Sequence, residues 1–458
     1  MSNTDYDPIV ARATAAGRGG IGIIRVSGST QALSVICEAL FPGKVLKPRT
    51  AFLLPVRSAA GDLIDQAVVL KFQGPHSYTG EDVLEIQAHG GPAVLQMIQS
   101  RVLEVGAAVE LRLAEPGEFS KRAFLNGRMD LTQAEAVVDL IDAGSASAAR
   151  AAARSLQGVF SQKVYEIAEH LTNLRAYVEA TLDFPEEDID FINDGRVARQ
   201  VDDILKELTD LEKRALYGKV LRDGLTVVMA GAPNVGKSSL MNALAQNEVA
   251  IVTDIAGTTR DRIEHDIDLD GLLIHLIDTA GVRETDDPVE KIGVERTLQA
   301  VETADVVLTL VDGTDKTAVS DTAQTWIRNR LREGVTEVLV MNKIDLGVDQ
   351  GKIPDGAVCI SAKTGEGIDA LLEKLKKISG NDIDFEGNFS ARTRHLTAIA
   401  KAKSHLSQVQ ESLQSMTLEL VAEELRLALN ELGTITGQIL PDDLLGIIFS
   451  KFCKIGRA

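Results

Sequence analysis

The eight residues GAPNVGKS, 231–238, limit most strongly what this chain can fold into. They follow the apolar run TVVMA directly and open an amphipathic segment, so a glycine-rich turn joins a strand to a helix. Backbone NH groups of such a turn point at phosphate oxygens, Lys237 suits the outer phosphates, and the Ser238 hydroxyl suits magnesium. The stretch therefore predicts a phosphate-binding loop in a mostly parallel α/β domain.

The surrounding sequence supports such a domain between two helical segments. From residue 222 to 380, apolar runs such as LTVVMAG, DVVLTLVD and VTEVLVMN alternate with amphipathic helical patterns, as in a mostly parallel sheet. The segments 116–185 and 388–440 instead carry apolar residues at helical spacing and predict long helices. Residues 1 to about 120 mix short apolar runs with Gly- and Pro-rich turns. We infer an α/β domain inserted into a helical domain, preceded by a mixed α/β domain.

Bulk properties narrow the class of protein. The sequence opens with no signal-like segment and has no apolar run of about 18 residues, so we expect a cytoplasmic protein without a membrane span. Its three cysteines form no closely spaced pair, and Cys359 is interpreted as a buried strand residue.

The net charge of −19 disfavours non-specific nucleic-acid binding. Between Glu386 and Glu411 all charges are basic, which fits either a local nucleic-acid patch or a solvated helix face.

A second motif selects the base. NKID, residues 342–345, ends the run VLVMN, and the carboxylate of Asp345 can accept hydrogen bonds from the ring NH and the exocyclic amino group of guanine. SAK, residues 361–363, would add backbone contacts to the carbonyl oxygen of the base. Together with the phosphate-binding loop, these motifs predict a GTP site.

A third motif concerns hydrolysis. DTAG, residues 278–281, places Asp278 near a magnesium shell and the Gly281 NH near the γ-phosphate. The next residue, Val282, is apolar and cannot orient a water molecule, so hydrolysis needs another route. Asn234 and the threonine-rich run TDIAGTTRD, residues 253–261, offer neutral oxygen donors that suit a monovalent cation beside the phosphates.

Long stretches outside these motifs resemble the TrmE/MnmE family of tRNA-modification GTPases. They are GRGGIGIIRVSG, YTGEDVLEIQAHGG and EPGEFSKRAFLNGRMDLTQAEAV in the first third of the chain and DDLLGIIFSKFC near its end. The likeness implies a multidomain chain of α/β and all-α parts. Its parts would be an N-terminal α+β folate-binding and dimerisation domain (1–120), a helical domain in two parts (121–218 and 383–458), and an inserted Ras-like P-loop GTPase domain (219–382).

The resemblance also implies roles for single residues. Asn234, Thr253, Ile255 and Thr258 would bind potassium, Ser238 and Thr259 would bind magnesium, and Glu290 would orient the attacking water in place of Val282. The GTP-binding residues implied are Asn234, Val235, Gly236, Lys237, Ser238, Ser239, Thr253, Asp254, Ile255, Ala256, Gly257, Thr258, Thr259, Asp278, Thr279, Ala280, Gly281, Asn342, Lys343, Ile344, Asp345, Ser361, Ala362 and Lys363.

The chemistry implied is addition of an aminomethyl or carboxymethylaminomethyl group to C5 of the wobble uridine of tRNA. The one-carbon unit would come from a tetrahydrofolate derivative, in the 5-formyl or methylene form, bound by Arg25, Glu85, Arg128 and Arg457. A homodimer and a partner subunit that uses FAD and NADH are implied as well. The chain carries no GxGxxG fingerprint that joins a strand to a helix, which agrees with flavin binding in a partner.

The C-terminal run FSKFCKIGRA departs from the family pattern of Cys, an aliphatic residue, Gly and Lys. Lys454 is inserted after Cys453, Arg457 stands where the terminal lysine is expected, and Ala458 is added. Cys453 is a candidate nucleophile if nearby cations lower its pKa, and a packed or exposed thiol is the alternative. For the whole chain, a ribosome-assembly or regulatory GTPase switch is the alternative function, since such proteins share the phosphate-binding and threonine-rich loops.

Overall fold

The computed structural model describes residues 7–183, 195–247, 264–278, 304–314, 335–347, 353–379, 388–413, 417–439 and 448. Two compact units divide the chain. The first combines Met1–Val138, Val164–Arg175 and Leu425–Ala458, and the second combines Asp139–Lys163 with Ala176–Glu424. Each unit therefore draws on segments that are far apart in the sequence, as an insertion requires.

The first unit contains a six-stranded sheet in the order β3-β4-β5-β2-β1-β6. Its pairs are antiparallel except β1 with β6. Buried and half-buried residues alternate along β2 and β4, as expected for strands with one face in a core. The strands are β1 (Ile9–Arg12), β2 (Gly19–Gly28), β3 (Phe52–Arg57), β4 (Leu63–Phe72), β5 (Asp82–Gly90) and β6 (Arg112–Leu113). The predicted mixed domain is thus a mostly antiparallel sheet with helices.

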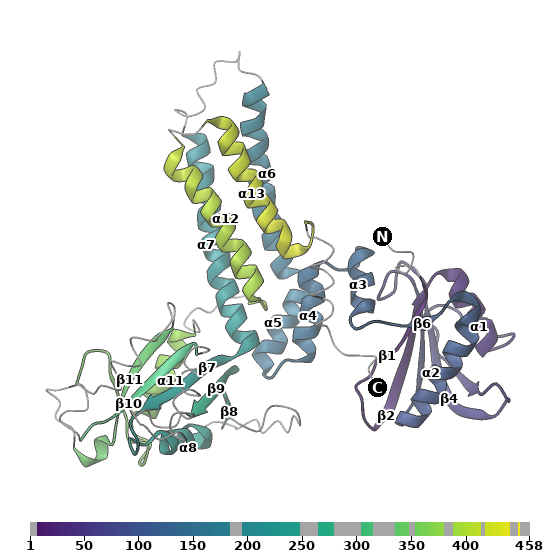
Figure 1. Ribbon diagram of the computed structural model, residues 1–458, viewed down its shortest axis with the longest axis horizontal. Helices are drawn as coiled ribbons and strands as arrows, with labels where there is room; N and C mark the ends of the chain where they lie inside the picture. Colours follow the sequence, from purple (N-terminus) through teal and green to yellow (C-terminus); the bar gives the residue numbers. More distant parts are fainter. Residues whose placement is uncertain are drawn as a thin grey trace, which may run out of the picture. The chain divides into compact units, whose positions relative to one another are not determined.

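Helices α1 (Thr30–Leu40) and α2 (Pro92–Gly106) pack on β2 and β5 and against each other (Figure 1). Ser29 caps α1 by accepting from the Ala32 NH, and Pro92 begins α2 at a position where no NH is needed. A one-turn helix η2 (Ala107–Val109) follows α2. The apolar faces of the helices and the sheet form one core cluster.

The helical stretch predicted from 116 to 185 is interrupted more often than its apolar periodicity suggests. It forms α3 (Glu118–Leu125), α4 (Leu131–Ile141), α5 (Ala146–Leu156) and the 25-residue α6 (Val159–Asp183). Ser145 begins α5 by accepting from the Ala148 NH, so the residues before it form a turn. The capping serine decides this boundary, not the Ala-rich composition.

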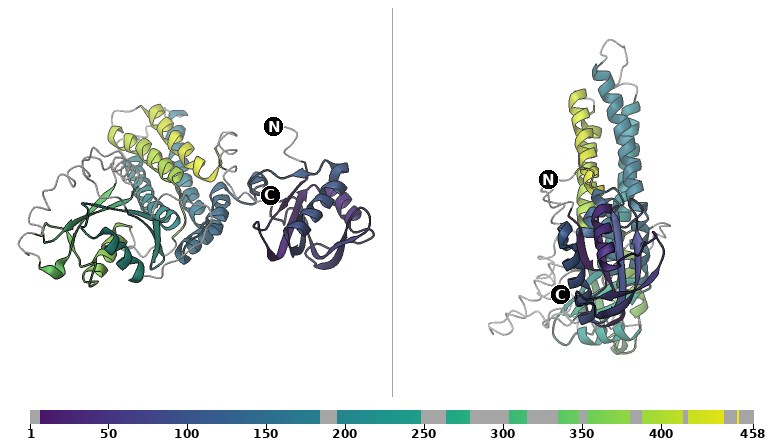
Figure 2. Two further views of the ribbon diagram at one scale, coloured as in Figure 1. Left: turned by 60° about the horizontal axis from the view of Figure 1, so that its bottom comes forward. Right: turned by 90° about the vertical axis from the view of Figure 1, so that its right-hand side faces the viewer.

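Three further long helices precede or follow the second sheet in the sequence. They are α7 (Arg196–Asp223), α12 (Thr393–Ser412) and α13 (Leu418–Thr436). Figures 1 and 2 show α12 alongside α7, although the whole second sheet lies between these two helices in the sequence. Helices from the two predicted halves of the helical domain therefore do pack together.

The second unit contains the predicted parallel sheet, in the order β12-β11-β10-β7-β9-β8. All neighbouring pairs are parallel except β8 with β9. Strands β7 and β10 are buried almost throughout, as central parallel strands are. The elements are β7 (Leu225–Gly231), α8 (Lys237–Asn247), β8 (Glu264–Leu269), β9 (Leu272–Asp278), β10 (Val306–Asp312), β11 (Thr336–Asn342), η4 (Ile344–Leu346), β12 (Val358–Cys359) and α11 (Ile368–Ile378).

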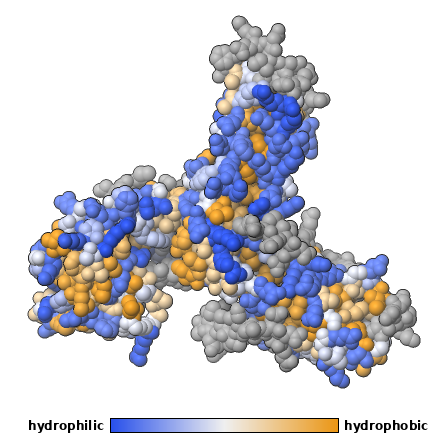
Figure 3. Space-filling view, turned by 180° about the vertical axis from the view of Figure 1, so that it is seen from behind, coloured by the Kyte–Doolittle hydropathy of each residue, from blue (hydrophilic) through white to orange (hydrophobic). Residues whose placement is uncertain are grey.

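The surface is mostly polar where it covers the long helices. In the space-filling view of Figure 3, hydrophilic residues dominate this region and hydrophobic ones form scattered patches. Within the described ranges, no helix combines the length and the apolar character needed to cross a bilayer. Cys359 does lie on a strand, as predicted, but it is only half-buried.

Candidate functional site

Four parallel strands end at one edge of the second sheet. Strand β7 ends at Gly231, β9 at Asp278, β10 at Asp312 and β11 at Asn342. Carboxyl ends of parallel strands in an open sheet are where ligands bind, because loops diverge there and leave a crevice. The phosphate-binding loop, Asp278 of DTAG and Asn342 of NKID therefore meet at the edge where a nucleotide is expected.

The phosphate-binding loop depends on two unusual backbone positions. Asn234 has a φ of +65° and Gly236 a φ of +100°. A Cβ at Gly236 would lie 2.2 Å from Nδ2 of Asn342, so only glycine fits there. The side chain of Asn234 is exposed, which leaves its amide oxygen accessible to a cation.

Lys237 begins α8 and is 8% exposed. Its ammonium donates to the carbonyl oxygens of Gly231 and Ala232 at 3.0 and 3.1 Å. Burial lowers the pKa of Lys237, and the negative charge of Asp278 acts in the opposite direction. An ammonium has three N–H donors, so two carbonyls can hold Lys237 in the loop while a third N–H serves a phosphate. Ser239, the third residue of α8, is exposed.

A magnesium ion fits beside Ser238. The Ser238 hydroxyl lies 3.1 Å from Oδ2 of Asp278 and donates to it. The other carboxylate oxygen, Oδ1, is buried and has no hydrogen-bond partner within the described part of the chain. A buried carboxylate oxygen without a donor is costly, and a hydrated cation would satisfy it.

Asn342 joins three loops of the site and is 3% exposed. Its Nδ2 donates to the Val235 carbonyl at 2.8 Å, and its Oδ1 accepts from the NH groups of Lys343 and Ala362 at 2.8 and 3.0 Å. This one side chain fixes the phosphate-binding loop, NKID and SAK relative to one another. The resemblance placed Asn342 among the GTP-binding residues but did not indicate this bracing role.

Among the described residues, the carboxylate predicted to select guanine accepts one side-chain hydrogen bond. Asp345 is exposed, and its Oδ1 accepts from the hydroxyl of the fully buried Ser361 at 2.7 Å. The Ile344 NH donates to the Ile360 carbonyl, which ties NKID to the segment that precedes SAK. Lys363 is exposed beside them. Asp345 is therefore oriented yet accessible to a ligand, as recognition of guanine requires.

Asp312 was not predicted as a site residue. Its Oδ2 lies 2.7 Å from Nζ of Lys343, and its Oδ1 accepts from the NH and hydroxyl of Thr314 at 3.0 and 2.6 Å. A signal for it was present in the sequence, because VVLTLVD ends in aspartate just as LLIHLID does.

In the first unit, two predicted folate residues form an ion pair. Arg25 on β2 faces Glu85 on β5, with 2.8 Å between Nε and Oε1. The Arg25 guanidinium lies 5.3 Å from the ring centre of Tyr78 and 6.0 Å from that of Phe119. A donor, an acceptor and aromatic faces suit a flat heterocycle such as a pterin. Arg128 is exposed, and its stem lies close to Gly80.

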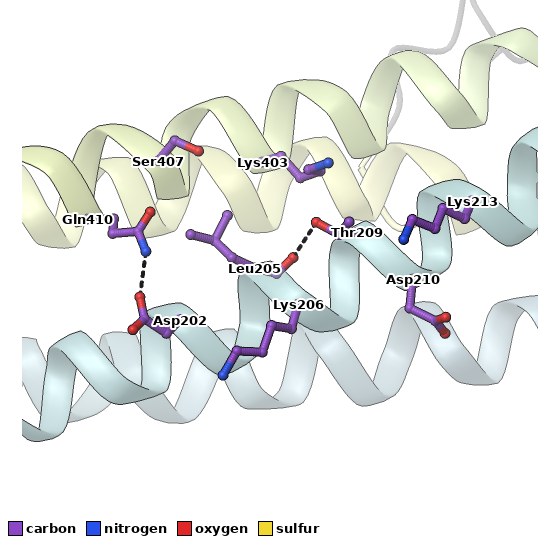
Figure 4. A pocket seen from close by; sticks show the side chains of 9 residues that line it. All are labelled: Asp202, Leu205, Lys206, Thr209, Asp210, Lys213, Lys403, Ser407 and Gln410. Carbon is purple, nitrogen blue, oxygen red and sulfur yellow. Dashed lines mark hydrogen bonds between the residues drawn. The ribbon is translucent and has the colours of Figure 1, made fainter.

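A groove of about 610 Å³ lies between α7 and α12 (Figure 4). Its lining mixes both signs of charge, and Gln410 donates to Asp202 across it. Lys403, at its edge, pairs with Glu212, and Arg392 pairs with Asp139 at 2.7 Å. The stretch between Glu386 and Glu411, which we call the basic window, contains four lysines and arginines, and two of them are thus paired with carboxylates. This pairing counts against a nucleic-acid patch there.

Several predicted site residues lie outside the described residues. They are Thr253, Asp254, Ile255, Ala256, Gly257, Thr258, Thr259, Thr279, Ala280, Gly281, Glu290, Cys453 and Arg457. The potassium ligands other than Asn234, the second magnesium ligand and the water-orienting residue remain predictions from the sequence. Among the residues that are described, no three His, Cys, Asp or Glu side chains cluster as a metal site.

Two family models match this chain. The model described as MnmE helical domain matches residues 131–453, and the model described as GTP-binding protein TrmE N-terminus matches residues 8–128. The two matches together cover most of the chain. The first spans 323 residues of 458, from 131 through 453, and includes the inserted sheet.

Two solved structures are also similar. A variant of Era from Aquifex aeolicus bound to GDP and aluminium fluoride is 28% identical over 39% of this chain and 66% of its own, with a TM-score of 0.29. The G domain of the FeoB iron transporter from T. maritima is 28% identical over 34% of this chain and 98% of its own, with a TM-score of 0.27. This chain thus spans slightly less than two thirds of the Era chain.

Proposed function

Because the chain belongs to the TrmE/MnmE family of tRNA-modification GTPases, we propose that it binds and hydrolyses GTP as one component of a tRNA-modifying complex. The observation that carries the nucleotide part is the position of Asn342, which braces the phosphate-binding loop, NKID and SAK at one sheet edge. A site preassembled in this way binds its ligand at a lower ordering cost.

Guanine is the base that the site favours. Asp345, oriented by Ser361, would accept from the ring NH and the amino group of guanine, a pair of donors that adenine lacks. Magnesium would be held by Ser238 and Thr259 together with phosphate oxygens, and Asp278 would accept from its water shell. Bound there, the ion neutralises charge on the β- and γ-phosphates.

We further propose that hydrolysis depends on potassium and on Glu290. The amide of Asn234 is accessible, and Thr253, Ile255 and Thr258 would complete the donor set. Hydrolysis should then be much faster in potassium than in sodium. Equal rates in the two salts, from folded protein, would contradict the cation mechanism. Glu290→Ala should keep nucleotide binding and lose most turnover.

For the tRNA chemistry we propose modification of the wobble uridine at C5 with a tetrahydrofolate one-carbon unit. Arg25 and Glu85 would contact the pterin, with Tyr78 or Phe119 against its face, and Arg128 with Arg457 would suit the anionic glutamyl tail. Arginine there offers a planar set of donors for a carboxylate. A homodimer, a partner subunit using FAD and NADH, and a cytoplasmic location complete this proposal.

Nucleoside analysis of tRNA from cells that lack this protein tests the proposal as a whole. Loss of the modified wobble uridine, restored by the wild-type chain, is the expected result. Normal modification together with accumulated ribosome precursors would instead favour a regulatory switch in ribosome assembly. Protection of the purified chain against heat by a reduced folate would test the ligand separately.

A further inference from the structure

The contacts of Asp312 give the Lys343 side chain a fixed place at the end of β10. Lys343 lies between Asn342 and Asp345 and has a left-handed φ of +69°. Its backbone is therefore held in a conformation that few non-glycine residues adopt. Its side chain is partly covered, with 32% exposed, and reaches the end of the neighbouring strand.

The partner of Lys343 is itself rigid. Both oxygens of Asp312 are engaged, Oδ1 by Thr314 and Oδ2 by Lys343. The Gly313 NH donates to the Asn342 carbonyl at 2.8 Å, so the ends of β10 and β11 are tied together as well. Burial raises the pKa of Asp312, but hydrogen bonds from Lys343 and Thr314 outweigh it and leave the pKa lowered, which keeps the carboxylate charged.

We propose that Asp312 is a positioning residue for guanine recognition, acting by holding the ammonium of Lys343 so that its aliphatic stem lies flat beside the base. This inference rests on the proposed function and adds a residue to it. An ammonium without this partner would sample many rotamers, and ordering it on binding would cost affinity. In this proposal Asp312 acts through Lys343 and not by contact with the nucleotide.

The test is Asp312→Asn in the full-length chain, with GDP and GTP affinities measured by fluorescent-nucleotide titration. We expect dissociation constants to rise about three- to tenfold, with KM rising and kcat unchanged. Asp305→Asn is the matched control. Asp305 directly precedes the first residue of β10, whereas Asp312 is the last residue of that strand, and Asp305 accepts from the Thr226 NH at 2.9 Å. It should leave nucleotide affinity unaltered even if it lowers thermal stability.

A double-mutant cycle separates positioning from a general structural effect. In a Lys343→Ala background, Asp312→Asn should change nucleotide affinity by less than about twofold, because the group it positions is gone. An equal loss in both backgrounds, or unchanged affinity in the single variant, would overturn the role of Asp312. Wild-type protein that binds no guanine nucleotide would instead overturn the proposed function.

A different set of contacts joins the β8–β9 hairpin to the helical elements of the second unit. The Ser145 hydroxyl, at the start of α5, donates to the Gly271 carbonyl in the hairpin turn at 2.8 Å. At the other end, Nε2 of His275 lies 3.0 Å from the Asp223 carbonyl at the end of α7. Both attachments are close-fitting, since a Cβ on Gly271 would lie 2.2 Å from Oγ of Ser147 and a Cβ on Gly224 would lie 2.5 Å from Nε2 of His275.

The hairpin also lies between two nucleotide motifs in the sequence. Strand β8 follows the run TDIAGTTRD after two residues, and β9 ends at Asp278 of DTAG. His275 is the cross-strand partner of Asp266, with 2.6 Å between Nδ1 and Oδ1, so the contact to α7 is braced by both strands. A shift of either motif with the bound nucleotide would therefore move a strand that α5 and α7 hold.

We also infer that this hairpin couples nucleotide state to the helical elements. The measurement is hydrogen exchange of α5 and α7 in the full-length chain, with GDP and with GDP–aluminium fluoride. The wild type should show a nucleotide-dependent difference in both helices, and His275→Phe should lose it in α7 while still binding nucleotide. His405→Phe, which removes a contact to Glu424 on α13, is the control and should retain the difference. A wild type that binds both ligands without such a difference, or a His275→Phe variant that keeps it in α7, would overturn the coupling.

Discussion

Replacing Asp139 with alanine should destabilise the second unit more than any exposed charge substitution. The Asp139 side chain is 4% exposed and accepts from three groups. Oδ1 accepts from Nε of Arg222 and from Nη2 of Arg392, each at 2.7 Å, and Oδ2 accepts from the Ser390 hydroxyl at 3.0 Å. Arg222 lies near the end of α7, just before the inserted sheet, and Arg392 follows that sheet. One carboxylate thus holds both chain connections of the insertion.

The magnitude follows from burial. Removing one partner of a fully buried pair costs about 3–5 kcal/mol, because the other charge is left unpaired. Here the two guanidinium side chains are 30% and 20% exposed, so water compensates part of the loss. We expect a loss of about 2–3 kcal/mol in the free energy of unfolding, which corresponds to about 4–10 °C in Tm at this size.

Calorimetry is the suitable assay, because a chain of two compact units need not unfold in one step. Asp210→Ala is the matched control, since Asp210 is 54% exposed and pairs with Arg214 on the surface of α7. Its expected effect is within about 0.5 kcal/mol. A transition in Asp139→Ala that falls no further than in Asp210→Ala would refute the reasoning that the buried carboxylate fixes the insertion.

Three further outcomes follow from the structure. Gly236→Ala should abolish nucleotide binding and leave the circular dichroism spectrum unchanged, because the new methyl group would clash with the Asn342 side chain. Tight nucleotide binding by this variant would contradict the geometry. Burial raises the pKa of Cys37 to about 11, so its thiol should resist iodoacetamide at pH 8 until the protein unfolds, as mass spectrometry can check. Burial raises the pKa of Glu118, but hydrogen bonds from Arg112 and other donors outweigh it and lower the pKa below 4.5. The stability that this lowered pKa contributes is present above about pH 4.5 and is lost as the pH falls through the pKa of Glu118 in the folded protein. Glu118→Gln should therefore make the decrease of Tm with falling pH less steep. An equally steep decrease would count against this role.

The sequence predicted those parts of the fold that local pattern determines. Runs such as LTVVMAG and VTEVLVMN became strands that end at the predicted motif residues, because continuous apolar runs have to be buried on both sides. The turn before Ser145 was missed, since the capping preference of one serine is weaker evidence than the helical periodicity around it. The register of the antiparallel first sheet, which pairs Arg25 with Glu85, could not be obtained from either strand alone.

Contacts between distant residues account for what the sequence could not provide. Asp139 and Arg392 are 253 residues apart, and Asn342 and Val235 are 107 residues apart. Nothing in the local sequence distinguishes Asp139 or Arg392 from ordinary charged surface residues, and the NKID motif does not indicate that Asn342 contacts Val235. Only the sheet order and the return of the chain after the inserted domain bring the partners together.

The same contacts bear on how a chain of net charge −19 would meet tRNA. Arg392 and Lys403 already donate to Asp139 and Glu212, and Arg394 and Lys401 also have interactions within the chain. A phosphate would have to displace a carboxylate to use Arg392 or Lys403, and the counterion release that drives such binding would be smaller. Under the proposed function, tRNA contacts therefore have to come from other cations of this chain or from another subunit. Charge reversal of Lys403 should accordingly leave tRNA affinity of the assembled complex within about twofold, as filter binding at fixed salt would measure, and a larger loss would restore the basic window as a binding surface.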